Sequence, residues 1–300
     1  MAKNYREKEL EYERTGQFDR DLNDEHRTFD ARDIGEGYRY LTKTPGEKIR
    51  RFFLLPAVKF FGSVYTFFAF GFRVKGKKNL RKIRKNGAIS VCNHAHEMDT
   101  LLVKLALGCR RTFHTGSYYL LKKGWAGRIF KAGGFLPVGS TVKDLEKLQN
   151  TVRELLGKKK IVNFYPEHAL WRRYEKVRPF KPGAFRFAVK FNVPVLPLFI
   201  EFRQTKPRKV LRLKEKVVMH ILPAVYPEEE GTLRAKSDAL LQKVRAAMIE
   251  KYESLYRRPM VFDCGEKVHG GSSVCGERDV SGAAGADSDA ETKGEAAVTV

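Results

Sequence analysis

The sequence predicts an α/β protein, with a layered domain whose largely parallel sheet is flanked by helices. Three observations predict this fold class. Short apolar runs alternate with helical patterns after Gly76, which is typical of parallel strands joined by helical connections. The segment before this alternation is almost wholly apolar and aromatic, which predicts a hydrophobic helical membrane-contact element in front of the domain. The ends of the 300-residue chain are polar, and its length suffices for one sizeable core with appendages.

The expected strands and helices follow one another along the chain. Apolar runs predict strands at residues 88–92, 111–117, 135–138, 160–164, 195–202 and 216–222. Helical spacing of apolar residues predicts helices at residues 99–107, 125–131, 143–156, 183–191 and 233–256.

Composition divides the chain into four parts. Residues 1–40 carry mixed charge and few apolar side chains, so they are expected to form a charged mobile arm or a loosely held helix. Residues 41–75 form the hydrophobic membrane-contact segment, and residues 76–262 form the folded domain. Residues 263–300 are rich in Gly, Ala, Ser and acids, which predicts a disordered tail.

The apolar stretch at residues 52–72 has a length that suits a bilayer span of roughly 20 residues. Pro56, Lys59 and Gly62 interrupt its apolar pattern, and basic residues flank it on both sides, so charge asymmetry assigns no orientation. We expect it to contact the membrane as a peripheral or monotopic element, or as one transmembrane segment. The alternative is a core helix or helical pair of a soluble domain.

Positive charge is concentrated in the middle of the chain. Residues 41–263 hold 47 basic and 17 acidic side chains, a balance that attracts nucleic acid, an anionic membrane or phosphorylated substrates. No nucleic-acid recognition motif accompanies these charges, so specific nucleic-acid binding is not expected. An anionic membrane surface fits better, because the basic run from Lys75 to Lys85 follows the aromatic stretch. A non-catalytic basic protein that binds anionic membrane or nucleic acid remains the alternative to an enzyme.

Cysteine usage and the first residues bear on the compartment. The four cysteines show no paired spacing, and the chain starts with a charged stretch rather than a signal peptide. An intracellular, reducing location is therefore expected.

His94 and Asp99 form the motif that carries the most chemistry. The strand at 88–92 delivers His94 to a loop, and Asp99 opens the following helix. A carboxylate that accepts a hydrogen bond from one ring nitrogen fixes the tautomer, so the other nitrogen can take a proton from a hydroxyl. From these two residues alone, the alternative is a structural role, in which the histidine caps a strand end and the aspartate caps a helix N-terminus. His96 does not complete a metal-ligand set with them, and no metal site is predicted.

The chain resembles the glycerolipid acyltransferases of the phosphatidic-acid-forming, His-x4-Asp type. The family carries four ordered blocks, and the resemblance covers about residues 75–225. The matching stretches are Asn93 to Asp99, Gly133 to Val138, Phe164 to Glu167 and Val193 to Leu198. Phe180-Lys181-Pro182-Gly183-Ala184 is also similar to a Phe-Lys-x-Gly-Ala run of the family.

The resemblance implies transfer of a fatty acyl group from acyl-CoA or acyl carrier protein to a glycerolipid hydroxyl. The default acceptor is 1-acyl-glycerol-3-phosphate, in phospholipid biosynthesis at the cytoplasmic face of the membrane. His94 would be the general base and Asp99 its orienting partner, with no acyl-enzyme, metal or organic cofactor. Amides near Val193–Val195 or at Thr100 would stabilise the oxyanion. The residues implied in substrate binding are Asn93, Gly134, Glu167, Arg178 and Lys181.

The chain departs from the family where acceptor phosphate is usually bound. Gly139 or Ser140 stands in place of the arginine that ends the second block, and His168-Ala169-Leu170 replaces Gly-Thr-Arg in the third. The acceptor head group therefore stays open. The cations that could replace the missing arginine are Arg172, Arg173, Arg178 and Lys181.

Overall fold

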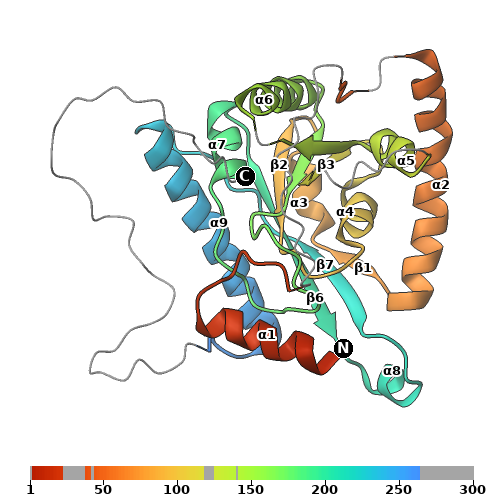
Figure 1. The fold of residues 1–300 in the computed structure, drawn as a ribbon, viewed down its shortest axis with the longest axis vertical. Coiled ribbons are helices and arrows are strands. Elements are labelled where there is room, and N and C mark those ends of the chain that lie inside the picture. The colour runs from red at the N-terminus through yellow and green to blue at the C-terminus, as the bar shows by residue number, and fades with distance from the viewer. Residues whose placement is uncertain (1, 23–37, 42–43, 118–124, 140, 264–300) are drawn as a thin grey trace, which may run out of the picture.

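The computed structural model describes residues 2–22, 38–41, 44–117, 125–139 and 141–263 (Figure 1). Its centre is one seven-stranded sheet with helices on both faces, so the predicted fold class is confirmed. Residues 23–37 of the expected arm, Ser140 and residues 264–300 of the expected tail lie outside the described residues. The predicted boundaries of the four parts stay predictions.

The sheet is mixed but mostly parallel. Its strand order is β1-β7-β6-β2-β5-β3-β4, and within it only β6 and β7 pair antiparallel. Strands β2, β3, β4, β5 and β6 therefore end at the same edge, where α/β proteins place their polar chemistry. The strands are β1 Arg73–Lys75, β2 Ala88–Cys92, β3 Thr112–Ser117, β4 Phe135–Val138, β5 Ile161–Phe164, β6 Val195–Arg203 and β7 Lys216–Ile221.

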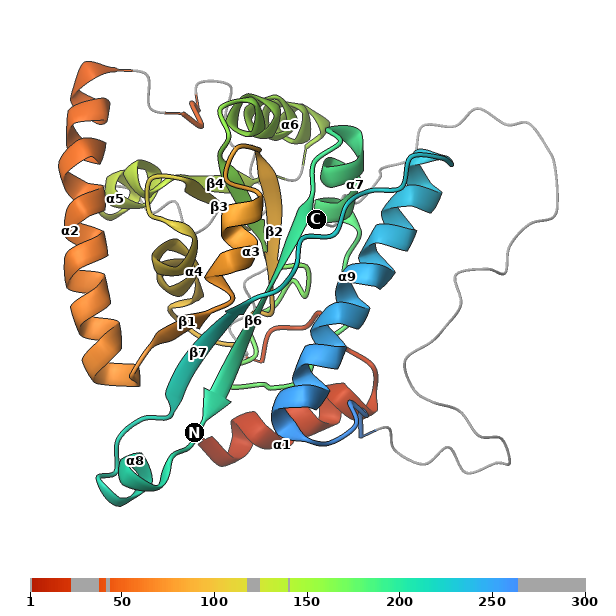
Figure 2. The same ribbon diagram turned by 180° about the vertical axis from the view of Figure 1, so that it is seen from behind.

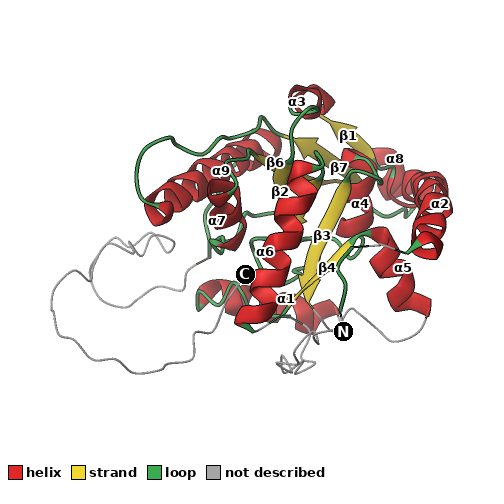
Figure 3. Ribbon diagram, turned by 90° about the horizontal axis from the view of Figure 1, so that it is seen from above, coloured by secondary structure: helices red, strands yellow, loops and turns green. Residues whose placement is uncertain are grey.

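Figure 3 shows helices on both faces of the sheet, and an apolar core lies between the sheet and the helices on each face. One joins the sheet to α6, α7 and α9, and the other joins it to α4 and the end of α2. The helices are α1 Ala2–Arg14, α2 Pro45–Phe70, α3 Lys77–Lys82, α4 Asp99–Leu107, α5 Trp125–Gly133, α6 Val142–Gly157, α7 Gly183–Lys190, α8 Lys206–Val210 and α9 Leu233–Tyr256.

Helix α2 runs without a break through the positions that interrupt its apolar pattern. Thr44 and Glu47 form a capping box at its start, and Gly71 closes it in the left-handed conformation. Pro56 lies inside the helix. At Gly62 the helix comes so close to α4 that an added Cβ would lie 2.9 Å from the Leu101 side chain, which explains the glycine.

Most of α2 is exposed although it is apolar. The helix is long and apolar enough to cross a membrane, yet only 11% of its apolar window is buried. A core helix of a soluble domain would be mostly buried, so the membrane-contact interpretation fits better. Figure 1 shows α2 at the side of the molecule, against α4 and α5. Its exposed aromatic side chains are Phe52, Phe53, Phe60, Phe61, Tyr65, Phe67 and Phe68.

Residues 2–22 pack against the loop that follows β5. Helix α1 lies beside the carboxyl end of α9 (Figure 2). Leu22 is buried with Trp171 and Tyr174, and the indole N–H of Trp171 donates to the carbonyl of Arg20 at 2.8 Å. The segment expected to be a mobile arm or loosely held helix thus includes a helix and turn that cover the domain.

Candidate active site

His94 and Asp99 meet at the carboxyl edge of the sheet. His94 follows β2, and Asp99 is the first residue of α4. The Nδ1 atom of His94 lies 2.7 Å from Oδ2 of Asp99, and the backbone N–H of Ala95 donates to the same oxygen at 3.1 Å. The carboxylate is 1% exposed and the imidazole 23%. Because Asp99 occupies Nδ1, Nε2 is the nitrogen that can take a substrate proton.

Tyr165 packs on the imidazole of His94. It follows β5, the parallel neighbour of β2, and its ring stacks on His94 with centroids 4.2 Å apart and planes 21° apart. The contact restricts the imidazole from the side that Asp99 does not hold. Tyr165 lies within the matching stretch from Phe164 to Glu167 but is not among the residues that the resemblance implies; its place after a central strand is the signal that could have found it.

Glu167 and Arg178 form a buried pair that holds the backbone of the His94 loop. One Glu167 oxygen accepts the backbone N–H of His94 at 3.0 Å and Nη2 of Arg178 at 2.9 Å, and the other accepts the N–H of Arg178 at 3.1 Å. Arg178 is fully buried and also donates to the carbonyl of Phe18 at 2.9 Å. Both side chains were expected to contact substrate, but in this structure they face the protein backbone.

Asn93 and Lys181 are also engaged within the protein. The buried Asn93 amide accepts the N–H of Ile200 at 2.7 Å and donates to its carbonyl at 3.3 Å. This pair ties the start of the catalytic loop to β6. The Lys181 ammonium is 34% exposed and lies 3.0 Å from Asp19. Contact of either residue with substrate stays a prediction.

Gly134 lies away from His94. It precedes β4, which is three strands from β2 in the sheet, a separation of roughly 14 Å. Its φ is +87°, and an added Cβ would lie 2.9 Å from the Phe113 ring. This glycine therefore serves a turn and close packing, and the structure does not bring it to the catalytic pair.

The candidate oxyanion donors at Val193–Val195 are wrongly placed. Val195 pairs with Ile89 at the start of β2, roughly 16 Å along the strand from His94. Its N–H already donates to the carbonyl of Val225 at 2.8 Å. The other candidate fits better, because α4 begins at Asp99 and its first turn, with Thr100, is next to the catalytic pair.

Arg172 is an exposed cation beside the His94 loop. The N–H groups of Trp171 and Arg173 donate to the carbonyls of His94 and Ala95 at 3.1 and 2.7 Å, which aligns the two segments. The Arg172 side chain is 47% exposed, and its Nε lies 2.9 Å from Glu97. Arg173 turns away and pairs with Glu215 at 2.6 Å.

The end of α2 reaches the catalytic loop. The Phe70 ring meets His96 edge to face, with centroids 4.7 Å apart, and burial lowers the pKa of His96. An open cavity of about 590 Å³ lies along the second half of α2. Its lining residues are Ser63, Val64, Thr66, Phe67, Phe68, Phe72, Arg73, Val74, Lys77 and Leu105.

The described residues contain no group of three or more His, Cys, Asp or Glu side chains that could hold a metal ion. The expectation of no metal and no cofactor stays a prediction.

Part of the chain is similar to known acyltransferases. Residues 71–201 match the family model described as Acyltransferase. The fold is similar to the crystal structure of PlsC, the 1-acyl-sn-glycerophosphate (LPA) acyltransferase from Thermotoga maritima. The TM-score is 0.51 and the identity 21%, over 73% of this chain and 86% of that one. Comparison with curated proteins gives no match. The match over residues 71–201 and the similar fold support the predicted resemblance to the glycerolipid acyltransferases.

Proposed function

We propose that this protein transfers a fatty acyl group from an acyl thioester, acyl-CoA or acyl carrier protein, to the hydroxyl of 1-acyl-glycerol-3-phosphate. This reaction would serve phospholipid biosynthesis at the cytoplasmic face of the membrane. The 2.7 Å contact between His94 and Asp99 carries the proposal, since it lies within the segment that matches the Acyltransferase family.

In the proposed mechanism His94 is the general base. Nε2 takes the proton of the acceptor hydroxyl while the hydroxyl oxygen forms a bond to the thioester carbonyl carbon. The carbon–sulfur bond then breaks, and the imidazolium returns the proton to the leaving thiolate. Asp99 stabilises the imidazolium between these steps. The reaction balances with the thioester and the alcohol alone, so it requires neither metal nor organic cofactor.

Direct attack, without an acyl-enzyme, agrees with the surroundings of Cys92. This thiol is the nucleophilic side chain nearest in sequence to His94, and it is fully buried. Burial raises its pKa, which opposes formation of the thiolate nucleophile.

For the acceptor we propose that Arg172 binds the phosphate group. Its half-exposed guanidinium lies beside the His94 loop, and a guanidinium suits bidentate phosphate recognition. This cation replaces the arginines that the family carries in its second and third blocks. The printed name of the T. maritima structure, an LPA acyltransferase, supports the same acceptor class.

For membrane access we propose that the exposed aromatic face of α2 lies in the lipid surface. The cavity of about 590 Å³ along α2 would then receive an acyl chain from the bilayer side. Phe70 connects this end of α2 to the catalytic loop through His96.

The test is an acceptor screen with radiolabelled acyl-CoA and acyl carrier protein donors. Lysophosphatidate should be acylated, and a monoacylglycerol of the same chain length, which lacks the phosphate, should react much more slowly. Absence of product with every lysolipid and both donors would contradict the proposal.

A further inference from the structure

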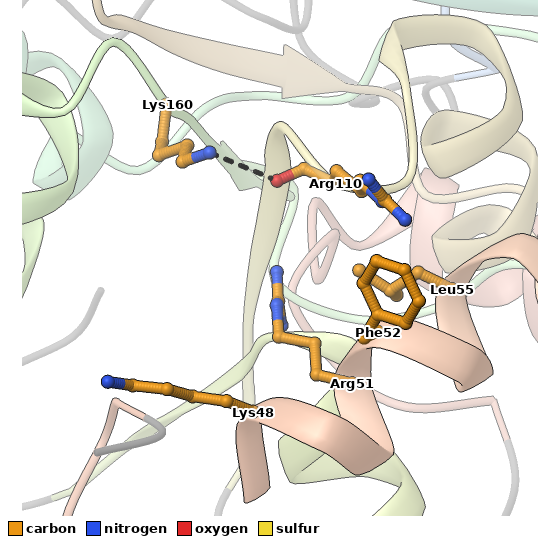
Figure 4. A pocket seen from close by; sticks show the side chains of 6 residues that line it. All are labelled: Lys48, Arg51, Phe52, Leu55, Arg110 and Lys160. Atoms are coloured by element: carbon orange, nitrogen blue, oxygen red, sulfur yellow. Dashed lines mark hydrogen bonds between the residues drawn. The ribbon is translucent and has the colours of Figure 1, made fainter. Parts of the chain in front are cut away.

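A second cavity, of about 260 Å³, lies at the other end of α2. Figure 4 shows α2 side chains on one side and Arg110 and Lys160 facing them from the loops before β3 and β5. Four of its lining side chains are cations and two are apolar. The lining residues are Lys48, Arg51, Phe52, Leu55, Arg110 and Lys160. We refer to it below as the basic cavity.

The basic cavity is far from the catalytic pair. It lies at the amino ends of β3 and β5, whereas His94 follows the carboxyl end of β2, and the three strands run parallel. Along α2, the 19 residues from Arg51 to Phe70 correspond to roughly 28 Å at 1.5 Å per residue. The basic cavity is therefore separate from the acceptor site proposed at Arg172.

The cations of the basic cavity lack acidic partners among the residues that the structure describes. Arg51 donates to the carbonyl of Ala132 at 2.6 Å, and Lys160 donates to that of Arg110 at 3.4 Å. Burial lowers the pKa of Arg51 and of Lys160. The neighbouring carboxylate, Glu47, pairs with Lys131 at 3.1 Å. Partly desolvated positive charge of this kind attracts an anion.

The basic cavity adjoins the apolar surface of α2. The Arg110 guanidinium lies 5.2 Å from the centroid of the Phe52 ring, which keeps it at the cavity wall. Phe53 and Ile49, on the same turns of α2, are 68% and 59% exposed. A ligand that enters here contacts cations and an exposed apolar helix face together. An anionic lipid is complementary to this combination, because it carries a negative headgroup next to apolar chains.

We propose that the basic cavity binds the phosphate of an anionic lipid headgroup while the lipid chains lie along α2. This site would hold the protein at an anionic membrane independently of acyl transfer. It does not rest on the proposed acyl transfer, since neither His94 nor the acceptor takes part; it shares with the proposed function only the placement of α2 at the lipid surface.

The experiment measures binding of the full chain to vesicles of phosphatidylcholine, with and without a minor fraction of phosphatidic acid. The test variant is Lys48→Gln/Arg110→Gln. The control, Arg186→Gln/Lys190→Gln, removes the same charges from exposed positions on α7, on the other face of the sheet. Wild type and the control variant should bind vesicles that contain phosphatidic acid more tightly than vesicles of pure phosphatidylcholine. The test variant should bind them roughly tenfold to thirtyfold more weakly than wild type, with unchanged binding to pure phosphatidylcholine.

Three results would overturn the proposal. Equal losses in both double variants would show diffuse attraction by the basic surface rather than a site. An unchanged affinity of the test variant for phosphatidic acid vesicles would show that the basic cavity does not contribute to membrane binding. Tight calorimetric binding of inorganic phosphate, with no gain on phosphatidic acid vesicles, would assign the cavity to a soluble phosphate ligand. Thermal unfolding of each variant checks the fold, and the single change of the exposed Lys48 to Gln serves if the double variant is unstable.

Discussion

Glu167 accepts the backbone N–H of His94 at 3.0 Å, and so joins the loop after β5 to the loop that carries the proposed catalytic base. The same oxygen receives the buried guanidinium of Arg178 at 2.9 Å. The position of His94 therefore depends on a buried ion pair as well as on Asp99. This relationship gives Glu167 a positioning role that requires no contact with substrate.

Glu167→Gln should destabilise the fold and slow the reaction. It leaves the fully buried Arg178 without a charge partner, and breaking a buried pair typically destabilises by about 3–5 kcal/mol. Urea unfolding measures the stability, and initial rates on the folded protein measure the activity. Glu201→Gln is the matched control, since Glu201 forms a buried pair with His220 at 2.8 Å. The control should lose stability with a much smaller effect on rate, and equal rate losses in both variants would refute the positioning role.

Asp99→Asn should lower kcat by roughly 10³–10⁴-fold with little change in KM. The amide keeps the shape of the carboxylate but cannot hold the required tautomer or stabilise the imidazolium. Steady-state kinetics with thiol release as the readout measure both constants. A fall in kcat of less than tenfold would show that Asp99 does not orient the base.

Arg172→Gln should raise KM for a phosphate-bearing acceptor by roughly tenfold, the change expected for loss of a charge-assisted contact of about 1.4 kcal/mol. The KM for a neutral acceptor should stay the same. Arg173→Gln is the matched control, because that neighbouring side chain pairs with Glu215. An identical rise for both acceptors would point to damage to the loop instead of lost phosphate recognition.

Lys104 should make the fold more stable as the pH rises. Its ammonium donates to the carbonyl of Thr112 at 2.8 Å, and burial lowers its pKa to about 7. Between that pH and the ordinary lysine value the unfolded chain binds a proton that the folded one does not, so stability increases with pH across this interval. Below about pH 7 both states are protonated and the contribution is constant.

The measurement is urea unfolding of wild type and Lys104→Met at about pH 7 and about pH 9. Lys104→Met should be more stable than wild type by about 2–4 kcal/mol at the lower pH, and the difference should shrink at the higher one. Lys190→Met, at an exposed position, should show neither effect. A difference that is independent of pH would mean that Lys104 stays charged in the folded state.

The sequence predicts the long elements well because their periodicity is strong. The strand expected at residues 88–92 is β2, and the helix expected at 99–107 is α4. The missed elements are β1, α3 and α8, which have three, six and five residues, too few for a period to show. Pro56 and Gly62 interrupt the apolar pattern of residues 52–72 but do not interrupt the helix itself. Strong caps at Thr44 and Gly71 define one continuous helix, and Gly62 permits close packing on Leu101.

Of the candidate site, the sequence could predict the pair but not its support. A strand end followed by a helix start suffices to bring His94 to Asp99. Whether Glu167 faces substrate or backbone depends on the path of the loop after β5, which includes the left-handed residues His168 and Arg173. Residues so far apart in sequence meet only through the tertiary fold. The order of the four blocks along the chain likewise does not reveal the order of the strands in the sheet, and it is the strand order that separates Gly134 from His94.

The most direct test compares His94→Ala with His96→Ala. Both changes remove an imidazole from the same loop. The His94 ring contacts the Asp99 carboxylate at 2.7 Å, whereas the His96 ring packs on Phe70. Initial rates of radiolabelled acyl transfer to lysophosphatidate are measured with thermal unfolding as the check on folding. We predict that His94→Ala lowers the rate by roughly 10²–10⁴-fold and that His96→Ala keeps most of it. A folded His94→Ala protein that acylates at the wild-type rate would contradict the assignment of His94 as the base.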